Sequence, residues 1–360
     1  MNSSSAIKQF ELFDSPLALF NNMLADIKEA KRYIYLEVYK FSKEGIGELF
    51  RDALAQKAAE GVEIKLLFDA WGTGSSKTFF KKIIDNGGEV RIFNTLRIGT
   101  RLITQSHRRN HRKLLIIDDS ISYIGSPNIT SYCLRWREIA LRLEGDIARS
   151  FKYIFINDFN VFKKFTFKTK HLTRTIHHDG NYDIIRDVPS ITKQRIMYKY
   201  LYLIKKAKKS VYIETPYFLV GYRLRKMIKD AVNRGVEVVI ALPLSSDVRL
   251  VDILRNHYLG ILFKDGVKFK MYYPGNLHSK LVLIDDSIFG ISSANFDYRS
   301  FRYLHEILLL GSNSEIINKL LEYKKNTLLN CKNFNYENWE KRPILEKIVA
   351  YMLIPFRYLF

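Results

Sequence analysis

The chain has 360 residues, of which 47% are hydrophobic and 26% are charged. This composition is ordinary for a folded globular protein, and the length suffices for two lobes that each bury a sheet. Lysine and arginine number 58 against 37 aspartates and glutamates, a formal charge of +21. A basic excess of this size predicts polyanionic partners, either nucleic acid or an anionic membrane surface.

Several classes of protein are disfavoured by the sequence. The two cysteines, Cys133 and Cys331, are too few for a disulfide framework or a thiolate metal site, which favours a reducing cytoplasm. The first 16 residues lack the features of a secretory signal. No apolar run reaches the roughly 18 residues of a spanning helix, so we expect any membrane contact to be peripheral. The adjacent residues His177, His178 and Asp179 rarely converge on one ion, so we expect no metal and no cofactor.

The first half alternates helical and extended patterns. Apolar residues recur at helical spacing before the run YIYLEVYKF, and a stretch rich in helix formers ends at Gly61 before VEIKLLFD. A shorter helix then meets the turn residues Asn86-Gly87-Gly88 ahead of EVRIF. The predicted order is helix 17–32, strand 33–41, helix 48–61, strand 62–69, helix 78–86 and strand 89–93.

The second half repeats this order, with GVEIKLL beginning at position 61 and GVEVVIA at position 235. It predicts helix 192–209, strand 210–218, helix 222–234, strand 236–243 and strand 267–273.

The stretch 166–190 is polar, basic and aperiodic, and we place the connection between the two halves there. We therefore expect an α/β protein of two pseudo-symmetric lobes, each a mixed sheet flanked by helices. The expected bounds are 1–165, the connection 166–190, 191–330, and a tail 331–360.

One pattern occurs in both halves, as NHRKLLIIDDSISYIGSPN and LHSKLVLIDDSIFGISSAN. Each copy reads His-x-Lys-x4-Asp, with an asparagine 17 positions after the histidine and a glutamate further on. Chance duplication of the whole pattern is implausible. The candidate site residues are His111, Lys113, Asp118, Asn128 and Glu138 in the first half, and His278, Lys280, Asp285, Asn295 and Glu306 in the second.

These residue types suit phosphoryl chemistry. Strand alternation points each histidine and its lysine to the same side, where the ammonium neutralises a phosphate oxygen and the asparagine amide donates another hydrogen bond. One neutral histidine attacks phosphorus while the other, protonated, gives a proton to the leaving alkoxide. A single His-x-Lys pair is usually ordinary surface, so the duplication carries the inference. We interpret Asp118 and Asp285, which belong to the motif, as turn scaffold rather than as reacting groups.

Two roles stay open for the glutamates Glu138 and Glu306. Each carboxylate either orients a histidine and raises its basicity, or forms a simple surface pair with a nearby arginine, Arg137 or Arg302. The sequence favours neither.

The paired motifs resemble those of the phospholipase D superfamily, and within it the bacterial cardiolipin synthases. The resemblance covers about residues 15 to 330. It departs from the family at Pro127 before the first asparagine, and at Ser292-Ser293 where the family has a Gly-Ser pair. The segments that carry the resemblance are RRNHRKLLIID (108–118), ETPYFLV (214–220), SSD (245–247), GVKFKMYYPGNLHSK (266–280) and SANFDYRS (293–300).

This resemblance implies two phospholipase D-like lobes with the active site at their interface, a phosphohistidine intermediate and no metal. It implies an anionic phospholipid substrate, with two phosphatidylglycerol molecules converted to cardiolipin and glycerol. By analogy His111 is the nucleophile and His278 the acid/base, although the pseudo-symmetry permits the reverse. Hydrolysis to phosphatidic acid and a nuclease activity are the alternatives. The membrane anchor common at the family's N-terminus does not occur in the sequence, so we expect a short member.

The end of the chain, RPILEKIVAYMLIPFRYLF, bears on the location of the protein. Apolar residues recur there at helical spacing until Pro355 interrupts the pattern. Such a tail either dips into lipid headgroups or packs on the lobes, and we favour the first. We expect a cytoplasmic protein, peripheral on the inner face of the cell membrane, with nucleic acid as the less favoured partner. The apolar residues are Ile344, Leu345, Ile348, Val349, Met352 and Leu353.

Overall fold

A computed structural model describes residues 7–73, 77–93, 108–163 and 176–359. The chain divides into two compact units, 1–185 and 186–360. The division falls within 166–190, where we expected the connection; residues 166–175 lie outside the described residues. The part from 176 onward is a hairpin of β9 (Ile176–Asp179) and β10 (Tyr182–Asp187) rather than an irregular linker.

Unit 1 contains a seven-stranded mixed sheet of order β1-β8-β7-β6-β2-β3-β4. Strands β2, β3 and β4 are parallel, and β6, β7, β8 and β1 add to them in antiparallel pairs. The seven strands are β1 (Gln9–Phe13), β2 (Tyr33–Val38), β3 (Glu63–Asp69), β4 (Glu89–Phe93), β6 (Leu114–Ile117), β7 (Ile121–Gly125) and β8 (Ala140–Glu144). The two-residue strand β5 (Arg109–Asn110) does not belong to this sheet. The helices are α1 (Pro16–Glu29), α2 (Ile46–Ala59), η1 (Lys77–Phe80), α3 (Lys81–Asp85), η2 (Ser131–Arg135) and α5 (Ile147–Lys163).

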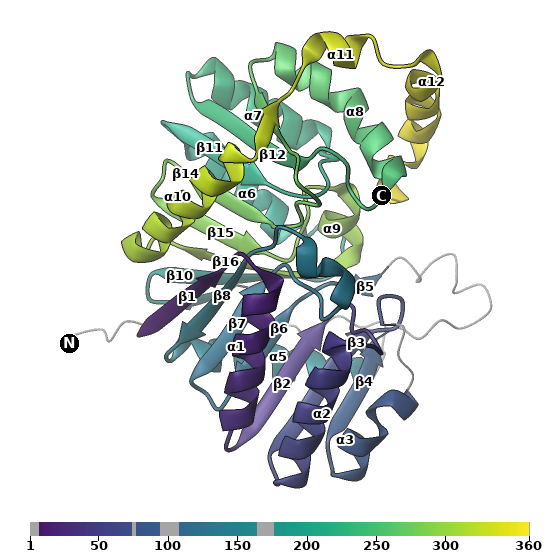
Figure 1. Ribbon diagram of the computed structural model, residues 1–360. Coiled ribbons are helices and arrows are strands. Elements are labelled where there is room, and N and C mark those ends of the chain that lie inside the picture. The colour runs from purple at the N-terminus through teal and green to yellow at the C-terminus, as the bar shows by residue number, and fades with distance from the viewer. Residues whose placement is uncertain (1–6, 74–76, 94–107, 164–175, 360) are drawn as a thin grey trace. The chain divides into compact units, whose positions relative to one another are not determined.

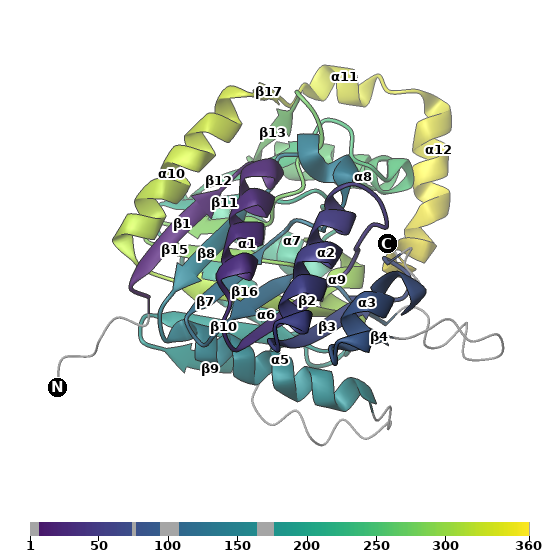
Figure 2. The same cartoon turned by 60° about the horizontal axis from the view of Figure 1, so that its bottom comes forward.

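Helices cover both faces of this sheet, with α1 and α2 on one face and α5 on the other (Figures 1 and 2). Alternate residues of β2 serve the two layers. Leu36 joins the core under α1 and α2 with Phe20, whereas Tyr35 stacks on Phe155 of α5 with ring centroids 5.1 Å apart. A strand buried on both faces requires a continuous apolar run, which explains the composition of YIYLEV.

Unit 2 contains a sheet whose path runs β17-β13-β12-β11-β14-β15-β16. The strands are β11 (Ser210–Glu214), β12 (Glu237–Pro243), β13 (Lys268–Tyr272), β14 (Leu281–Ile284), β15 (Ile288–Ser292), β16 (Leu304–Gly311) and β17 (Cys331–Asn333). The helices are α6 (Arg195–Lys206), α7 (Tyr222–Asn233), α8 (Arg249–Lys264), α9 (Tyr298–Tyr303), α10 (Ser314–Leu329), α11 (Tyr336–Glu340), α12 (Ile344–Leu353) and η4 (Ile354–Leu359).

The two units are copies of one plan. In unit 2 the parallel strands β11, β12 and β13 correspond to β2, β3 and β4, and the antiparallel strands β14, β15 and β16 to β6, β7 and β8. Strand β6 begins at residue 114 and β14 at residue 281, an offset of 167 residues that also separates the two histidine motifs. The predicted α/β class with two lobes of mixed sheet is confirmed.

The C-terminal residues 331–360 are part of unit 2. They begin with β17, which pairs with β13, and α12 then lies along α8 (Figure 2). Ala350 of α12 is buried, whereas Ile344, Leu345 and Met352 are each at least 67% exposed. The helix therefore packs on the unit by one face and keeps an apolar face exposed. Among the described residues no helix has both the length and the apolar character to cross a membrane.

Candidate active site

Each motif lies at one end of a β-hairpin. His278 and Lys280 come directly before β14, and Asn295 follows β15, the partner strand of β14. Ser292 donates its backbone N–H to the carbonyl of Lys280 at 3.1 Å, so the hairpin brings the ends of the motif together. Unit 1 repeats this arrangement across β6 and β7. All six side chains are buried, with exposures from 2% to 8%: His111, Lys113, Asn128, His278, Lys280 and Asn295.

The histidine and lysine of unit 2 lie on the same side of their segment. Lys280 Nζ is 3.2 Å from His278 Nε2 and 2.6 Å from the His278 carbonyl oxygen. An ammonium group only donates, so Nε2 accepts this bond when the imidazole is neutral and carries its proton on Nδ1. In unit 1, Lys113 Nζ likewise donates to the carbonyl of His111 at 2.6 Å. In both units, therefore, the lysine side chain turns back and donates to the backbone carbonyl of its own motif's histidine.

Unit 1 places an aromatic ring, Tyr39, beside its histidine. The rings of Tyr39 and His111 meet edge to face at 5.2 Å, and Lys113 Nζ lies 5.7 Å from the Tyr39 ring centroid. The next residue, Lys40, donates its backbone N–H to Asn128 Oδ1 at 3.3 Å. This contact uses the amide oxygen of Asn128, so its Nδ2 group is the end suited to donate to an anion.

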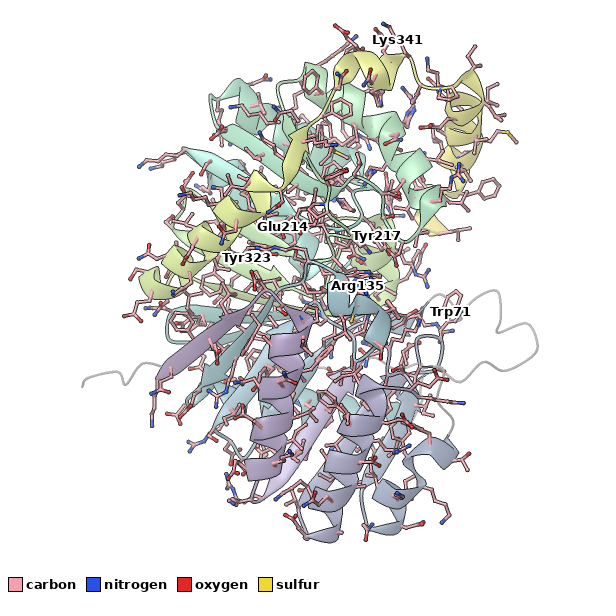
Figure 3. The ribbon with its side chains drawn as sticks, in the orientation of Figure 1. Trp71, Arg135, Glu214, Tyr217, Tyr323 and Lys341 are labelled. Carbon is pink, nitrogen blue, oxygen red and sulfur yellow. The ribbon has the colours of Figure 1, made fainter. Side chains whose placement is uncertain are left out.

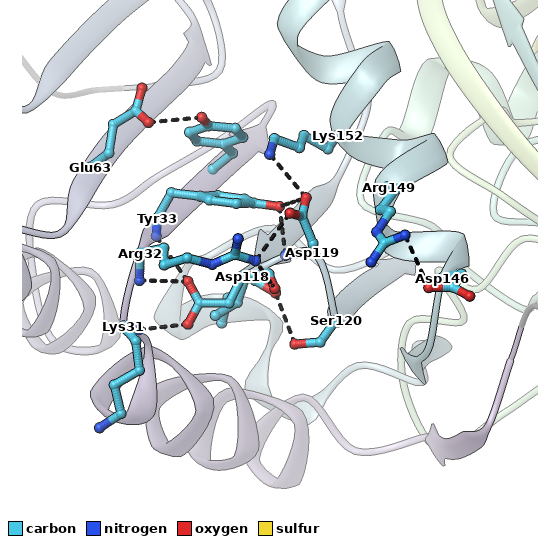
Figure 4. Close-up of polar contacts among 12 residues, drawn as sticks. Lys31, Arg32, Tyr33, Glu63, Asp118, Asp119, Ser120, Asp146, Arg149 and Lys152 are labelled. Carbon is cyan, nitrogen blue, oxygen red and sulfur yellow. Dashed lines mark hydrogen bonds and ion pairs between the residues drawn. The ribbon is translucent and has the colours of Figure 1, made fainter.

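The motif aspartates hold the backbone. Asp118 accepts hydrogen bonds from the backbone N–H groups of residues 31, 32 and 33 at 2.5 to 2.9 Å (Figure 4). Asp285 accepts from those of residues 208, 209 and 210 at 2.6 to 2.9 Å. Both have positive φ, 54° and 53°, which aspartate tolerates better than most residues. Burial acts to raise the pKa of the Asp285 carboxyl, but these backbone donors outweigh it and hold that pKa below its ordinary value.

The glutamates Glu138 and Glu306 are buried, at 1% and 0% exposure, so a surface pair does not describe either. Each carboxylate accepts a hydrogen bond from a serine two residues before the asparagine, Ser126 and Ser293 respectively. Each serine Oγ also accepts the backbone N–H of the residue after the glutamate, at 3.0 Å. These bonds fix the segments that carry Asn128 and Asn295. Arg137 pairs instead with Asp14, at 2.7 Å.

The middle residue of His-x-Lys points to the opposite face of the sheet, as strand alternation requires. In unit 2 it is Ser279, whose hydroxyl donates to the fully buried carboxylate of Glu214 on β11. Tyr212 of the same strand and Tyr323 of α10 also donate to this carboxylate, each at 2.6 Å. Glu214 and Tyr323 are labelled in Figure 3. Three hydroxyl donors compensate the burial of one charge.

In unit 1 the middle residue is Arg112, which is buried and forms an ion pair with Asp158 of α5. Its guanidinium lies 4.0 Å from Glu37, the β2 counterpart of Glu214, and Asn110 donates to that carboxylate at 2.8 Å. The sequence did not single out Glu37 or Glu214. The recurrence of the glutamate in YIYLEVYKF and SVYIETPYF is the signal that could have found them.

The chain matches the family described as cardiolipin synthase, PLD-like domain, over residues 23–159 and 200–327. The major cardiolipin synthase ClsA of Bacillus subtilis is 33% identical over 93% of this chain and 73% of its own length. A cardiolipin synthase of Clostridium perfringens is 32% identical over 94% of this chain and 74% of its own length.

Solved structures share the fold. The phosphatidylserine synthase of Haemophilus influenzae has a TM-score of 0.79 at 15% identity, covering 99% of this chain and 97% of its own. The polyphosphate kinase of Porphyromonas gingivalis has a TM-score of 0.62 at 12% identity, covering 99% of this chain and 55% of its own. The family match and the identity to its members decide the assignment: the chain belongs to the cardiolipin synthase family of phospholipase D-like proteins and is an enzyme of the phospholipase D superfamily.

Proposed function

We propose that the protein is a phosphatidyltransferase that converts two phosphatidylglycerol molecules into cardiolipin and glycerol through a phosphohistidine. The observation that carries this proposal is the equivalent placement of two His-x-Lys motifs on matching hairpins, each with its lysine folded over its histidine. The names of the relatives, which are cardiolipin synthases, support the choice of substrate.

In the first half-reaction the histidines of both motifs act on one phosphate. The lysine ammonium groups and the asparagine amides hold its non-bridging oxygens and stabilise the charge that builds on them. A histidine nitrogen attacks phosphorus and forms the N–P bond, while the P–O bond to glycerol breaks. The second histidine, protonated, gives its proton to the departing glycerol oxygen.

In the second half-reaction the acceptor is the free hydroxyl of another phosphatidylglycerol. The histidine that gave its proton now accepts one from this hydroxyl, whose oxygen attacks phosphorus as the N–P bond breaks. Cardiolipin leaves and both histidines return to their starting states. We assign His111 as the nucleophile and His278 as the acid/base. Because the motif is repeated, the reverse assignment is the alternative that a trapping experiment must distinguish.

The chain end supplies a membrane contact in this proposal. Ile344, Leu345, Ile348, Tyr351 and Met352 of α12 are between 50% and 74% exposed. Apolar side chains on one exposed helix face enter the interfacial region of a bilayer, and a net charge of +21 attracts anionic headgroups. The protein then works as a peripheral enzyme on the cytoplasmic face of the cell membrane.

The test uses purified protein with phosphatidylglycerol vesicles and no added metal. Lipid products are separated and identified by mass spectrometry for the wild type and for His111→Ala and His278→Ala. His178→Ala is the matched control, because this histidine has a 74% exposed side chain and lies outside both motifs. Labelled phosphatidylglycerol, quenched in alkali, identifies which histidine carries the phosphatidyl group.

We expect the wild type and His178→Ala to form cardiolipin and glycerol. Neither motif variant should form these products. Phosphatidic acid in place of cardiolipin would make the protein a hydrolase with the same catalytic residues. No lipid turnover, together with cleavage of DNA that His278→Ala abolishes, would make it a nuclease. Full activity of a Lys113→Ala or Lys280→Ala variant would overturn the electrostatic role of the lysines.

A further inference from the structure

Unit 2 contains a cavity of about 550 Å³ that is separate from the residues of the motif. Its walls come from α6, α7, α9 and η4, and they carry four arginines: Arg223, Arg225, Arg302 and Arg357. The volume lies within the range of small-molecule sites in proteins. Asp297 is the carboxylate in the lining, so the walls are strongly cationic.

The arginines are held in place without being neutralised. Arg225 donates to the carbonyl of Val220 at 2.6 Å, and Arg357 donates to the carbonyl of Ile354 at 3.2 Å. In the part of the chain that the structure describes, none of the four guanidinium groups forms an ion pair with a carboxylate. Within the same part, Arg357 Nε is buried and makes no hydrogen bond. A planar guanidinium with unused donors suits a phosphate group, which it binds through two parallel hydrogen bonds.

Aromatic rings set the positions of these side chains. The Arg302 guanidinium carbon lies 4.5 Å from the Tyr358 ring centroid and 5.3 Å from that of Tyr298. Arg357 also donates to the Tyr358 hydroxyl, at 2.9 Å. Stacking on rings orients a guanidinium while leaving its edge N–H groups for a ligand. The site is thus arranged before an anion enters it.

Asp297 does not cancel this charge. Its carboxylate is 4% exposed, caps α9, and accepts the backbone N–H of Ser300 at 2.6 Å. Burial raises the pKa of this carboxyl to about 6, and the nearby Glu306 also acts to raise it. The carboxylate is therefore occupied as a helix cap, while the guanidinium groups remain for an external anion.

The cavity lies at the same end of the sheet as the histidine motif. Glu214, the last residue of β11, pairs with Leu281, the first residue of β14, so His278 and Lys280 are located beside the end of β11. The loop that follows β11 leads into α7, whose first residues line the cavity. The segment after Asn295 also lines the cavity, with Asp297 and Arg302.

We infer that this arginine cavity binds the phosphodiester of an anionic phospholipid, and that during transfer it holds the acceptor phosphatidylglycerol, whose own phosphate is not cleaved. The role in transfer rests on the proposed function; the anion binding does not. Cardiolipin keeps two phosphates, so the enzyme needs a second anion site besides the one where phosphorus reacts. The segment η4 also links the cavity to lipid, because Arg357 lines the cavity while Phe356 and Leu359 are 56% and 44% exposed.

The binding test uses the full chain with His111→Ala to prevent turnover, and monomeric dihexanoyl-phosphatidylglycerol as the probe in calorimetry. The variant Arg302→Gln/Arg357→Gln should raise the dissociation constant by roughly tenfold to a hundredfold, as expected for lost charge-assisted hydrogen bonds. Arg249→Gln is the control, because Arg249 is an exposed residue at the start of α8 and does not line the cavity. This variant should change the dissociation constant less than about twofold. An unchanged constant in the double variant overturns the anion site.

Inorganic phosphate distinguishes the source of the anion. If inorganic phosphate displaces the lipid only at a concentration far above that of the lipid, the site is one for a phospholipid. If phosphate competes as well as the lipid does, the lipid part of the inference is overturned. Thermal unfolding of each variant is measured first. If the double variant unfolds, Arg302→Gln alone carries the test, because this partly exposed side chain is held by ring contacts.

The kinetic test separates acceptor from donor. With active protein, Arg302→Gln/Arg357→Gln should keep the first-turnover release of glycerol, slow the formation of cardiolipin at least tenfold, and raise the fraction of phosphatidic acid. Equal loss of glycerol release and cardiolipin would overturn the acceptor role. If the wild type makes no cardiolipin, the proposed function and the acceptor role both fail, and the calorimetry alone decides whether the cavity binds a phospholipid.

Discussion

Asp118 and Asp285 are equivalent residues of the two units, and each carboxylate accepts hydrogen bonds from three consecutive backbone N–H groups. In both units those groups belong to the start of the first parallel strand, β2 or β11, and the residues before it. The aspartate therefore ties the hairpin that carries the histidine to the neighbouring strand. The third residue of the motif contributes to folding, whereas the first two act on the phosphate in the proposed reaction.

Replacing Asp285 by asparagine should destabilise the protein without changing the chemistry of each folded molecule. Asparagine tolerates the same positive φ, but it removes the charge and replaces one of the two acceptor oxygens by an NH2 group that only donates. We expect the free energy of unfolding to fall by about 1 to 3 kcal/mol. Chemical denaturation measures it, with Asp286→Asn as the control, since Asp286 shares the positive φ but binds only Lys324 among the described residues. A kcat reduced more than the folded fraction would contradict a purely structural role.

The stability contributed by Asp285 should depend on pH in a defined direction. Its folded pKa lies below the ordinary value of 3.8, so the contribution is present above about pH 4 and is lost as the pH falls through the folded pKa. We expect the difference in unfolding free energy between wild type and Asp285→Asn to be constant near neutral pH and to shrink below pH 4. Burial raises the pKa of the Asp187 and Asp297 carboxyls to about 6, so these two groups change the stability with pH in the opposite direction. Both proteins contain them, so their effect cancels when the unfolding free energies of wild type and variant are subtracted. A difference that grew on acidification would refute the assignment.

Tyr323 should influence the reaction from the far face of the sheet. Its hydroxyl helps to hold Glu214, which holds Ser279 between His278 and Lys280. Tyr323→Phe removes one hydrogen-bond donor from the Glu214 carboxylate, so Glu214 and the Ser279 that it binds are held less firmly. We therefore expect kcat to fall about three- to tenfold while KM stays within twofold.

Tyr336→Phe is the matched control for this variant, because its hydroxyl bonds to the exposed Glu340 at 3.0 Å. Steady-state assays on phosphatidylglycerol in mixed micelles separate kcat from KM. A loss in Tyr323→Phe explained entirely by a lower folded fraction would mean that the tyrosine supports the fold and not the position of the motif.

The exposed face of α12 should set the affinity for membranes. The variant Ile348→Asp/Met352→Asp places two charges among side chains that are 50% and 67% exposed. Sedimentation with phosphatidylglycerol vesicles should show at least a tenfold loss of binding, and soluble short-chain substrate should still be turned over. Leu17→Asp, on a 53% exposed leucine of α1, is the control. Equal binding by all three proteins would mean that α12 does not contact the membrane.

Local patterns predicted the elements that alternate in the first half of each unit. The expected helix 48–61 is α2 (Ile46–Ala59), and the expected strand 236–243 is β12 (Glu237–Pro243). The helices α5, α8 and α10 were not predicted. In α5 the residues that face the sheet include Phe151, Phe155 and Phe159. Aromatic residues are common in strands, so their helical spacing is a weak signal without the sheet that they cover.

The motif residues themselves could be found from sequence because short-range spacing fixes which side chains share a face. Their supports could not. The contact between Ser279 and Glu214 joins residues 65 positions apart, and that between Tyr323 and Glu214 joins residues 109 apart. Such pairs depend on which strands become neighbours. The arginine cavity likewise depends on η4 folding back onto α9, which places Arg357 in the same cavity as Arg302.

The residue between histidine and lysine makes the two halves chemically distinct. Behind the first motif is a charged cluster of Arg112, Asp158 and Glu37; behind the second, hydroxyl groups surround Glu214. Exchanging the motif segments would leave an arginine without its aspartate in one half and two carboxylates without their cation in the other. The two motif segments are therefore not interchangeable, because each depends on the buried cluster of its own half.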